Sequence, residues 1–131
     1  MHYALLIYGA PDAPDAAAAA AATDLAARAD DGVIDSWVDY TRALKDAGVL
    51  AGAEQLRGTE TATCVRLRGG ERLMTDGPFV ETKEHLLGFY LVDVPDLDAA
   101  VTWAYRMPIV RHGTVEVRPV IRGVEWRAVL E

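Results

Sequence analysis

Two apolar runs determine the fold of this chain: HYALLIY at residues 2–8 and LLGFYLV at residues 86–92. Both are rich in the aromatic and branched side chains that favour strands, and both are apolar at odd and even positions alike. A strand that is apolar on both sides is usually covered on both sides. We therefore predict that the two runs pair at the centre of one sheet. Gly88, inside the second run, predicts a bulge or the close approach of another backbone.

Helical periodicity follows each run. The first helix has a continuous stripe on one face, which Gly48 is placed to end; the stripe comprises Val33, Trp37, Tyr40, Thr41, Leu44, Ala47 and Gly48. We interpret its aromatic residues as core, because aromatics at helical spacing usually pack. The second helix is expected to begin at its N-cap Asp96 and to end at Pro108. Its predicted buried stripe is Leu97, Ala100, Val101, Ala104 and Met107.

Three further strands are predicted. Residues 61–68 alternate between apolar and polar, Gly69-Gly70 forms a two-residue turn, and residues 71–75 return as the second strand of a hairpin. Residues 114–120 alternate again, and Pro119 suits an edge strand. The single cysteine, Cys64, excludes an internal disulfide, and we interpret it as a packed thiol rather than a nucleophile.

An alanine-rich stretch lies between the first run and the first helix. Residues 16–22 are seven consecutive alanines, and Asp15 is placed to cap a helix there. A surface helical insertion near residues 15–30 is predicted, with a frayed insertion as the alternative.

The order of the predicted elements indicates a single α+β domain over residues 1–131. It is strand, helix, hairpin strands, central strand, helix and strand, as in the ferredoxin-like split βαβ arrangement with both helices on one face of an antiparallel sheet. The other face of the sheet would then expose apolar residues from two central strands. The simplest cover is the same face of a second copy, which predicts a homodimer with a ligand cavity between the sheets.

Composition narrows the classes of function. The net charge of −7 argues against general nucleic-acid binding, which needs basic residues to neutralise phosphates. No segment reaches the roughly 18 apolar residues that suggest a membrane span, and no signal peptide is evident, so we expect a cytoplasmic protein. The charge is unevenly distributed, with eight Asp between residues 11 and 48 and five Arg from residue 105 onward. We interpret this as two differently solvated faces; a surface for an acidic ligand is the alternative.

The sequence TDGPFVETKE at residues 75–84 carries a family resemblance. Together with five other stretches, at residues 3–8, 47–50, 87–90, 95–100 and 112–120, it closely resembles the DGPF subgroup of the YCII-related proteins. The resemblance implies a dimeric α/β barrel built on a ferredoxin-like fold, and for some members an association with sigma factors. Some YCII-related proteins resemble enzymes and have a His on the first helix and an Asp near the end of the second. Here no His lies between Pro11 and Gly48, and Met107 precedes Pro108, so that acid/base pair is not transferred.

The loop after the hairpin supplies the candidate site. Asp commonly bonds the backbone N–H two residues on, but Pro78 has none, so the Asp76 carboxylate needs another partner or faces a cavity. Phe79 would then form an apolar wall of a pocket. The ligand-binding candidates are Asp76, Phe79, Glu81, Lys83 and Arg118, and the catalytic candidates are Asp76 and His112. A purely architectural turn, which anchors the dimer, is the alternative.

Two functions remain open at this stage. The first is a small-molecule-binding or regulatory accessory protein linked to sigma-factor signalling. The second is an enzyme that performs acid/base chemistry on an organic acid or lactone, with His112 as acid/base and Arg118 as anion clamp. The three histidines have no recognisable metal-ligand spacing, so no metal and no cofactor are expected.

Overall fold

A four-stranded antiparallel sheet forms the centre of the protein, in a computed structural model that describes residues 1–10, 31–79, 83–121 and 129. Its strand order is β2-β5-β1-β6, so the two apolar runs pair at the centre as predicted. The strands are β1 (His2–Gly9), β2 (Leu50–Gln55), β5 (His85–Asp93) and β6 (Thr114–Pro119). Pro119 lies on an edge strand, which is confirmed because β6 pairs only with β1. The predicted insertion near residues 15–30 lies outside the described residues.

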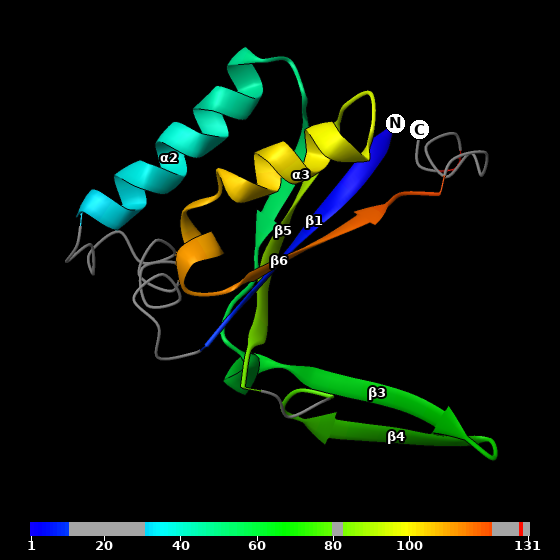
Figure 1. Ribbon diagram of the computed structural model, residues 1–131. Helices are drawn as coiled ribbons and strands as arrows, with labels where there is room; N and C mark the ends of the chain where they lie inside the picture. Colours follow the sequence, from blue (N-terminus) through cyan, green and yellow to red (C-terminus); the bar gives the residue numbers. More distant parts are fainter. Residues whose placement is uncertain (11–30, 80–82, 122–128, 130–131) are drawn as a thin grey trace.

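Both helices cover the same face of the sheet (Figure 1). They are α2 (Asp31–Asp46) and α3 (Leu97–Tyr105), and the Asp96 side chain caps α3 by accepting a hydrogen bond from Ala99 N. Beneath them is the core: Tyr3, Leu5, Ile7, Tyr40, Leu44, Tyr90, Val92, Val94, Ala100, Ala104, Met107 and Ile109. Gly48 has φ +73°, a left-handed conformation that suits glycine at a helix end.

Two expectations for the helices need correction. Leu97 is 50% exposed rather than buried, because it is the first residue of α3 and lies beyond the sheet-facing stripe. The helix α3 ends at Tyr105, with Arg106 as its C-cap, and Pro108 instead begins the short 3₁₀ helix η3 (Pro108–Arg111), whose Ile109 is fully buried. Proline suits this position because the first residue of a helix has no intrahelical N–H bond to lose. The side chain of Val33 falls outside the described part.

Gly88 shows both features predicted for it. The β1–β5 register shifts between Ile7 and Tyr8, beside the Gly88 pairing. A Cβ atom at residue 88 would lie 2.5 Å from the backbone oxygen of Glu54, so only glycine fits where β2 approaches β5.

The second face of the sheet carries a half-buried apolar surface. Paired residues share a face, and neighbours along a strand alternate. Leu6 opposite Phe89 and Ala4 opposite Leu91 therefore point away from the helices, and all four side chains are half-buried. We call this surface, with Tyr8 and Leu86, the open face; no described helix covers it.

The predicted hairpin forms outside the four-stranded sheet. Within the part of the chain that the structure describes, strands β3 (Thr63–Arg68) and β4 (Glu71–Asp76) pair only with each other, and Figure 1 shows the ribbon extending from the end of the sheet, away from α2. The fourth strand of the sheet is instead β2, which the sequence pattern missed. The chain thus has a ferredoxin-like α+β core with a projecting arm.

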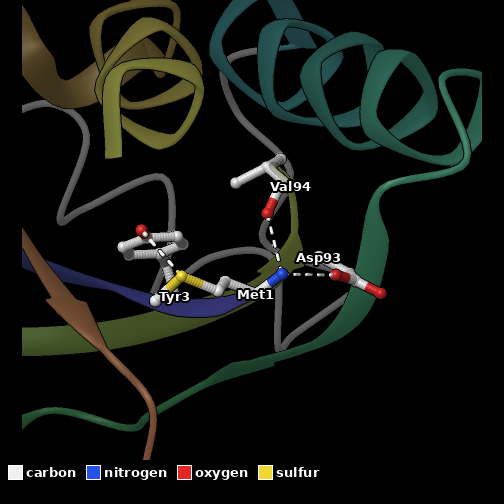
Figure 2. A network of polar contacts seen from close by, with 4 residues as sticks. All are labelled: Met1, Tyr3, Asp93 and Val94. Atoms are coloured by element: carbon white, nitrogen blue, oxygen red, sulfur yellow. Dashed lines mark hydrogen bonds and ion pairs between the residues drawn. The ribbon is translucent and has the colours of Figure 1, made fainter. Parts of the chain in front are cut away.

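The start of β1 is tied to the end of β5 (Figure 2). The N-terminal ammonium group donates to Asp93 Oδ1 at 3.3 Å and to the Val94 carbonyl at 3.0 Å, and the Tyr3 hydroxyl donates to Met1 Sδ at 3.7 Å. Met1 and Asp93 are exposed, so their ion pair contributes little to stability. No described helix has the length and hydrophobicity needed to span a membrane.

Candidate functional site

The candidate site begins at the turn that leaves β4. Gly77 has φ +99°, so a side chain here would be strained, and its N–H donates to the Ala62 carbonyl at 2.8 Å. The Cys64 thiol donates to the Gly77 carbonyl at 3.1 Å. Both backbone groups of Gly77 are therefore held by the start of the hairpin, at Ala62 just before β3 and at Cys64 within it. This geometry agrees with Cys64 as a structural thiol.

Phe79 lies beside an arginine of the hairpin. Its ring is 68% exposed, and the Arg66 guanidinium carbon lies 4.3 Å from the ring centroid. A guanidinium at this distance from an aromatic face makes a cation–π contact worth roughly 0.5–1 kcal/mol at an exposed site. The pair presents an aromatic surface and a positive charge together, a combination suited to a planar or anionic ligand.

Two long-range hydrogen bonds anchor the loop to the sheet. Thr59 Oγ1 and His85 Nδ1 are 3.0 Å apart, which joins the 3₁₀ turn η2 (Thr59–Thr61) to the first residue of β5. The Thr114 hydroxyl donates to Glu84 Oε2 at 2.9 Å, which joins the end of the loop to β6. Sequence reasoning missed these contacts, because each joins residues more than 25 positions apart and no local pattern marks them.

The structure gathers some candidate residues and separates others. Asp76 and Lys83 are exposed near the base of the hairpin, and Asp76 has no hydrogen-bond partner for its carboxylate within the described part of the chain. Glu81 lies outside the described residues. His112 caps η3 before β6 begins, whereas Arg118 lies near the far end of β6 opposite Ala4.

The spacing along β6 determines whether His112 and Arg118 of one subunit can contact the same small ligand. Thr114 and Arg118 are four residues apart, and an extended strand rises about 3.3 Å per residue, so their backbones are separated by about 13 Å. His112 lies farther still. One copy of the chain therefore does not place the proposed acid/base and the proposed anion clamp on the same small ligand.

Edge strand β6 instead forms a polar wall beside the open face. Arg118 pairs with Ala4, Glu116 with Leu6 and Thr114 with Tyr8, so all three polar residues face the same way as the open face. Glu54, on the opposite edge strand β2, pairs with Phe89 and faces that way too. The open face is thus apolar in the middle and charged along both edges.

The covered face contains an aromatic cluster. Tyr40 makes edge-on contacts with Trp37, Tyr90 and Trp103, and the Tyr40 hydroxyl donates to the Trp103 carbonyl at 2.8 Å. Burial raises the pKa of Tyr40 far above its ordinary value, and the neighbouring Tyr90 adds to the rise while Arg106 opposes it. Burial also raises the pKa of Tyr90, and the hydrogen bond between the Tyr90 and Thr41 hydroxyls opposes that rise. Both hydroxyls stay protonated at neutral pH, so this cluster joins α2, α3 and β5 as core.

Groups of His, Cys, Asp and Glu that could hold a metal ion are not found among the residues the structure describes.

Comparison with known proteins places the chain in a family. The model of the YCII-related domain matches residues 1–127, so the chain belongs to the YCII-related family. It is also similar to an uncharacterised protein of Rhizobium meliloti (strain 1021), with 43% identity over 77 residues. That match covers 57% of this chain and 62% of the relative.

Proposed function

We propose that the chain is a homodimeric small-molecule-binding accessory protein, assembled through the open face into a dimeric α/β barrel. The observation that carries this proposal is an apolar sheet centre, built from Leu6, Phe89 and Leu91, that no described element covers. Its charged edges and apolar middle match the core-and-rim composition of protein interfaces. Two such faces packed together stand about 10 Å apart and enclose side chains from both subunits.

The ligand we propose is a small organic acid held at the edge of that space. The Arg66–Phe79 pair supplies positive charge and an aromatic surface, and Lys83 lies exposed on the loop that leaves the hairpin. Because Arg118 lies near the end of β6 that is far from this loop, it would reach the ligand from the second subunit. An anion held by arginine and a planar group beside an aromatic ring are complementary to these side chains. Asp76 and Glu81 complete the proposed rim as hydrogen-bond acceptors.

The cellular role we propose is regulatory and cytoplasmic. It rests on the resemblance of residues 75–84 to the DGPF subgroup, for which an association with sigma factors is implied. Acid/base catalysis on an organic acid or lactone is the second candidate. Thr114, Glu116 and Arg118 favour it, because all three would face the space between two apposed sheets.

Light scattering on the purified chain tests the assembly. We expect a dimer at micromolar concentration, and we expect Leu6→Glu to yield a folded monomer because it buries a charge at the centre of the interface. Val38→Glu is the matched control, since Val38 is an exposed apolar residue on α2, on the other side of the sheet. A wild-type monomer, or a Leu6→Glu variant that remains dimeric, would refute the proposed interface.

Thermal-shift measurements with a panel of small carboxylic acids test the ligand. We expect stabilisation of the wild type that is lost in Asp76→Asn and in Arg118→Gln. Arg111→Gln is the control, because Arg111 is exposed in η3 and lies outside the proposed rim. Equal shifts in all four proteins would reject the proposed binding residues while leaving the dimer intact.

A further inference from the structure

The β3–β4 hairpin has one bare apolar face. Val65 pairs with Met74 and Leu67 with Arg72, so Val65, Leu67 and Met74 share one side of the ribbon with Arg72. These three side chains are 75%, 64% and 74% exposed. The other side carries Arg66, against which Phe79 packs. We call the bare side the arm face.

No described element of the same subunit covers this face. Outside the pairing of β3 with β4, the ribbon has few contacts with any described element. A two-stranded ribbon alone is at best marginally stable in water. Its base is nevertheless fixed, because Gly77 N donates to the Ala62 carbonyl and Leu56 N donates to the Leu87 carbonyl at 2.9 Å. A hairpin with a fixed base and an exposed apolar side is suited to packing on another molecule.

The length of the arm and its position beside the open face both indicate that this other molecule is a second copy of the chain. The six-residue strands make an arm of about 20 Å, twice the spacing of about 10 Å between packed sheets. The arm also leaves the sheet beside Leu86, an open-face residue that is 36% exposed. A partner seated on the open face would therefore lie within the arm's reach.

The charge of the hairpin also indicates a second copy of the chain. The hairpin carries Arg66, Arg68 and Arg72 against Glu71 and Asp76, a net charge of +1, whereas the chain as a whole has a net charge of −7. Glu54 and Glu116, at the two edges of the open face, contribute to that negative charge. A weakly basic arm on an acidic body is attracted to another copy of the same body.

We propose that the β3–β4 hairpin is an exchanged arm, which packs its arm face on the partner subunit of the homodimer. The turn from Asp76 to Phe79 lies at the base of this arm, so each candidate site is completed by the surface of the second subunit. This inference rests on the proposed dimer, and it adds that the hairpin is part of the interface.

Sedimentation equilibrium on arm variants tests the inference. Burying one large apolar side chain contributes at least about tenfold in affinity, and the change occurs twice in a symmetric dimer, so we expect Met74→Asp to raise the dissociation constant about 100-fold. Val65→Asp should behave in the same way. Val38→Asp on α2 is the matched control and should dimerise as the wild type does, with circular dichroism verifying the fold of each variant.

Hydrogen exchange supplies an independent readout that does not change the hairpin itself. We expect the amides of β3 and β4 to be protected in the wild-type dimer and to lose that protection in Leu6→Glu, whose substitution lies on the sheet. If Leu6→Glu separates the subunits while Met74→Asp and Val65→Asp leave the dissociation constant unchanged, the exchanged arm is overturned and the sheet interface stands. A wild-type monomer overturns both.

Discussion

The four-stranded sheet and the β3–β4 hairpin are built from similar strands but are stabilised in different ways. On the sheet, Leu5 and Val92 are fully buried beneath α2 and α3, and Leu44, on α2, is fully buried in the same core. On the hairpin, no residue of β3 or β4 is fully buried. The difference teaches that strand formation and strand stability have separate origins in this chain. Strand pairing and a glycine turn are enough to form the hairpin, whereas its stability depends on the surface that packs against it.

The largest expected effect is at the centre of the covered face. Leu44→Ala should lower the free energy of unfolding by about 2–5 kcal/mol, since it opens a cavity in a packed core. Leu67→Ala on the hairpin is the contrasting change, and in the monomeric Leu6→Glu background it should cost less than about 0.5 kcal/mol. Urea denaturation measures both, and equal losses would show that the two regions do not differ as described.

The next effect concerns the contact of two backbones. Gly88→Ala should cost about 1–3 kcal/mol, because the new methyl group would force β2 away from β5 at Glu54. Gly52→Ala is the matched control on the neighbouring strand, where the added carbon would lie 3.6 Å from a Leu91 methyl group, an ordinary contact. The comparison fails if Gly52→Ala destabilises the protein as much as Gly88→Ala does in urea denaturation.

A smaller effect is expected from Tyr40→Phe. At neutral pH it removes the hydrogen bond to the Trp103 carbonyl, at a cost of about 1 kcal/mol. Burial raises the folded-state pKa of Tyr40 above the ordinary value of 10.0, so the unfolded chain loses this proton first as pH rises. The free energy of unfolding of the wild type should therefore fall above about pH 10.

Denaturation curves at pH 8 and pH 11 check this effect. Tyr40→Phe should weaken the alkaline loss of stability, and the remaining loss should include Tyr90, whose pKa is also raised by burial. The same pH dependence in wild type and variant would contradict a buried, protonated Tyr40.

The smallest effect is at the base of the arm. Thr59→Val removes the partner of His85 Nδ1, and we expect amide exchange in the hairpin to increase about fivefold, the equivalent of about 1 kcal/mol. Thr102→Val is the control, because it also loses one threonine hydroxyl contact, to the Asp98 carbonyl, but in α3. Faster exchange in the hairpin of both variants would show that Thr59 does not anchor it specifically.

Much of this fold could be predicted from sequence, because its main elements carry strong local patterns. The apolar runs in β1 and β5, the stripe of α2 and the Gly69-Gly70 turn each depend on neighbouring residues. Strand β2 has the sequence LAGAEQ, whose small and polar residues have little strand preference. It becomes a strand because β5 offers an edge to pair with, and pairing with a distant strand leaves no periodic signal.

The candidate site could likewise be predicted only where its signal is local. Gly77 and Pro78 predicted a turn, and the chain bends there, with Gly77 at φ +99°. The contacts that position it, from Thr59 to His85 and from Thr114 to Glu84, join segments that only the fold brings together. The loop could therefore be located from the sequence, but the hydrogen bonds that hold it in place could not.

The aromatic cluster has a practical consequence for observing the two regions separately. Trp37 and Trp103 both belong to it, and the third tryptophan, Trp126, lies outside the described residues. The single cysteine, Cys64, lies on β3 of the arm. Indole fluorescence therefore reports mainly on the packing of helices over the sheet, while the rate of thiol labelling reports on the hairpin. The native sequence thus carries one spectroscopic and one chemical probe, each sensitive to a different half of the molecule.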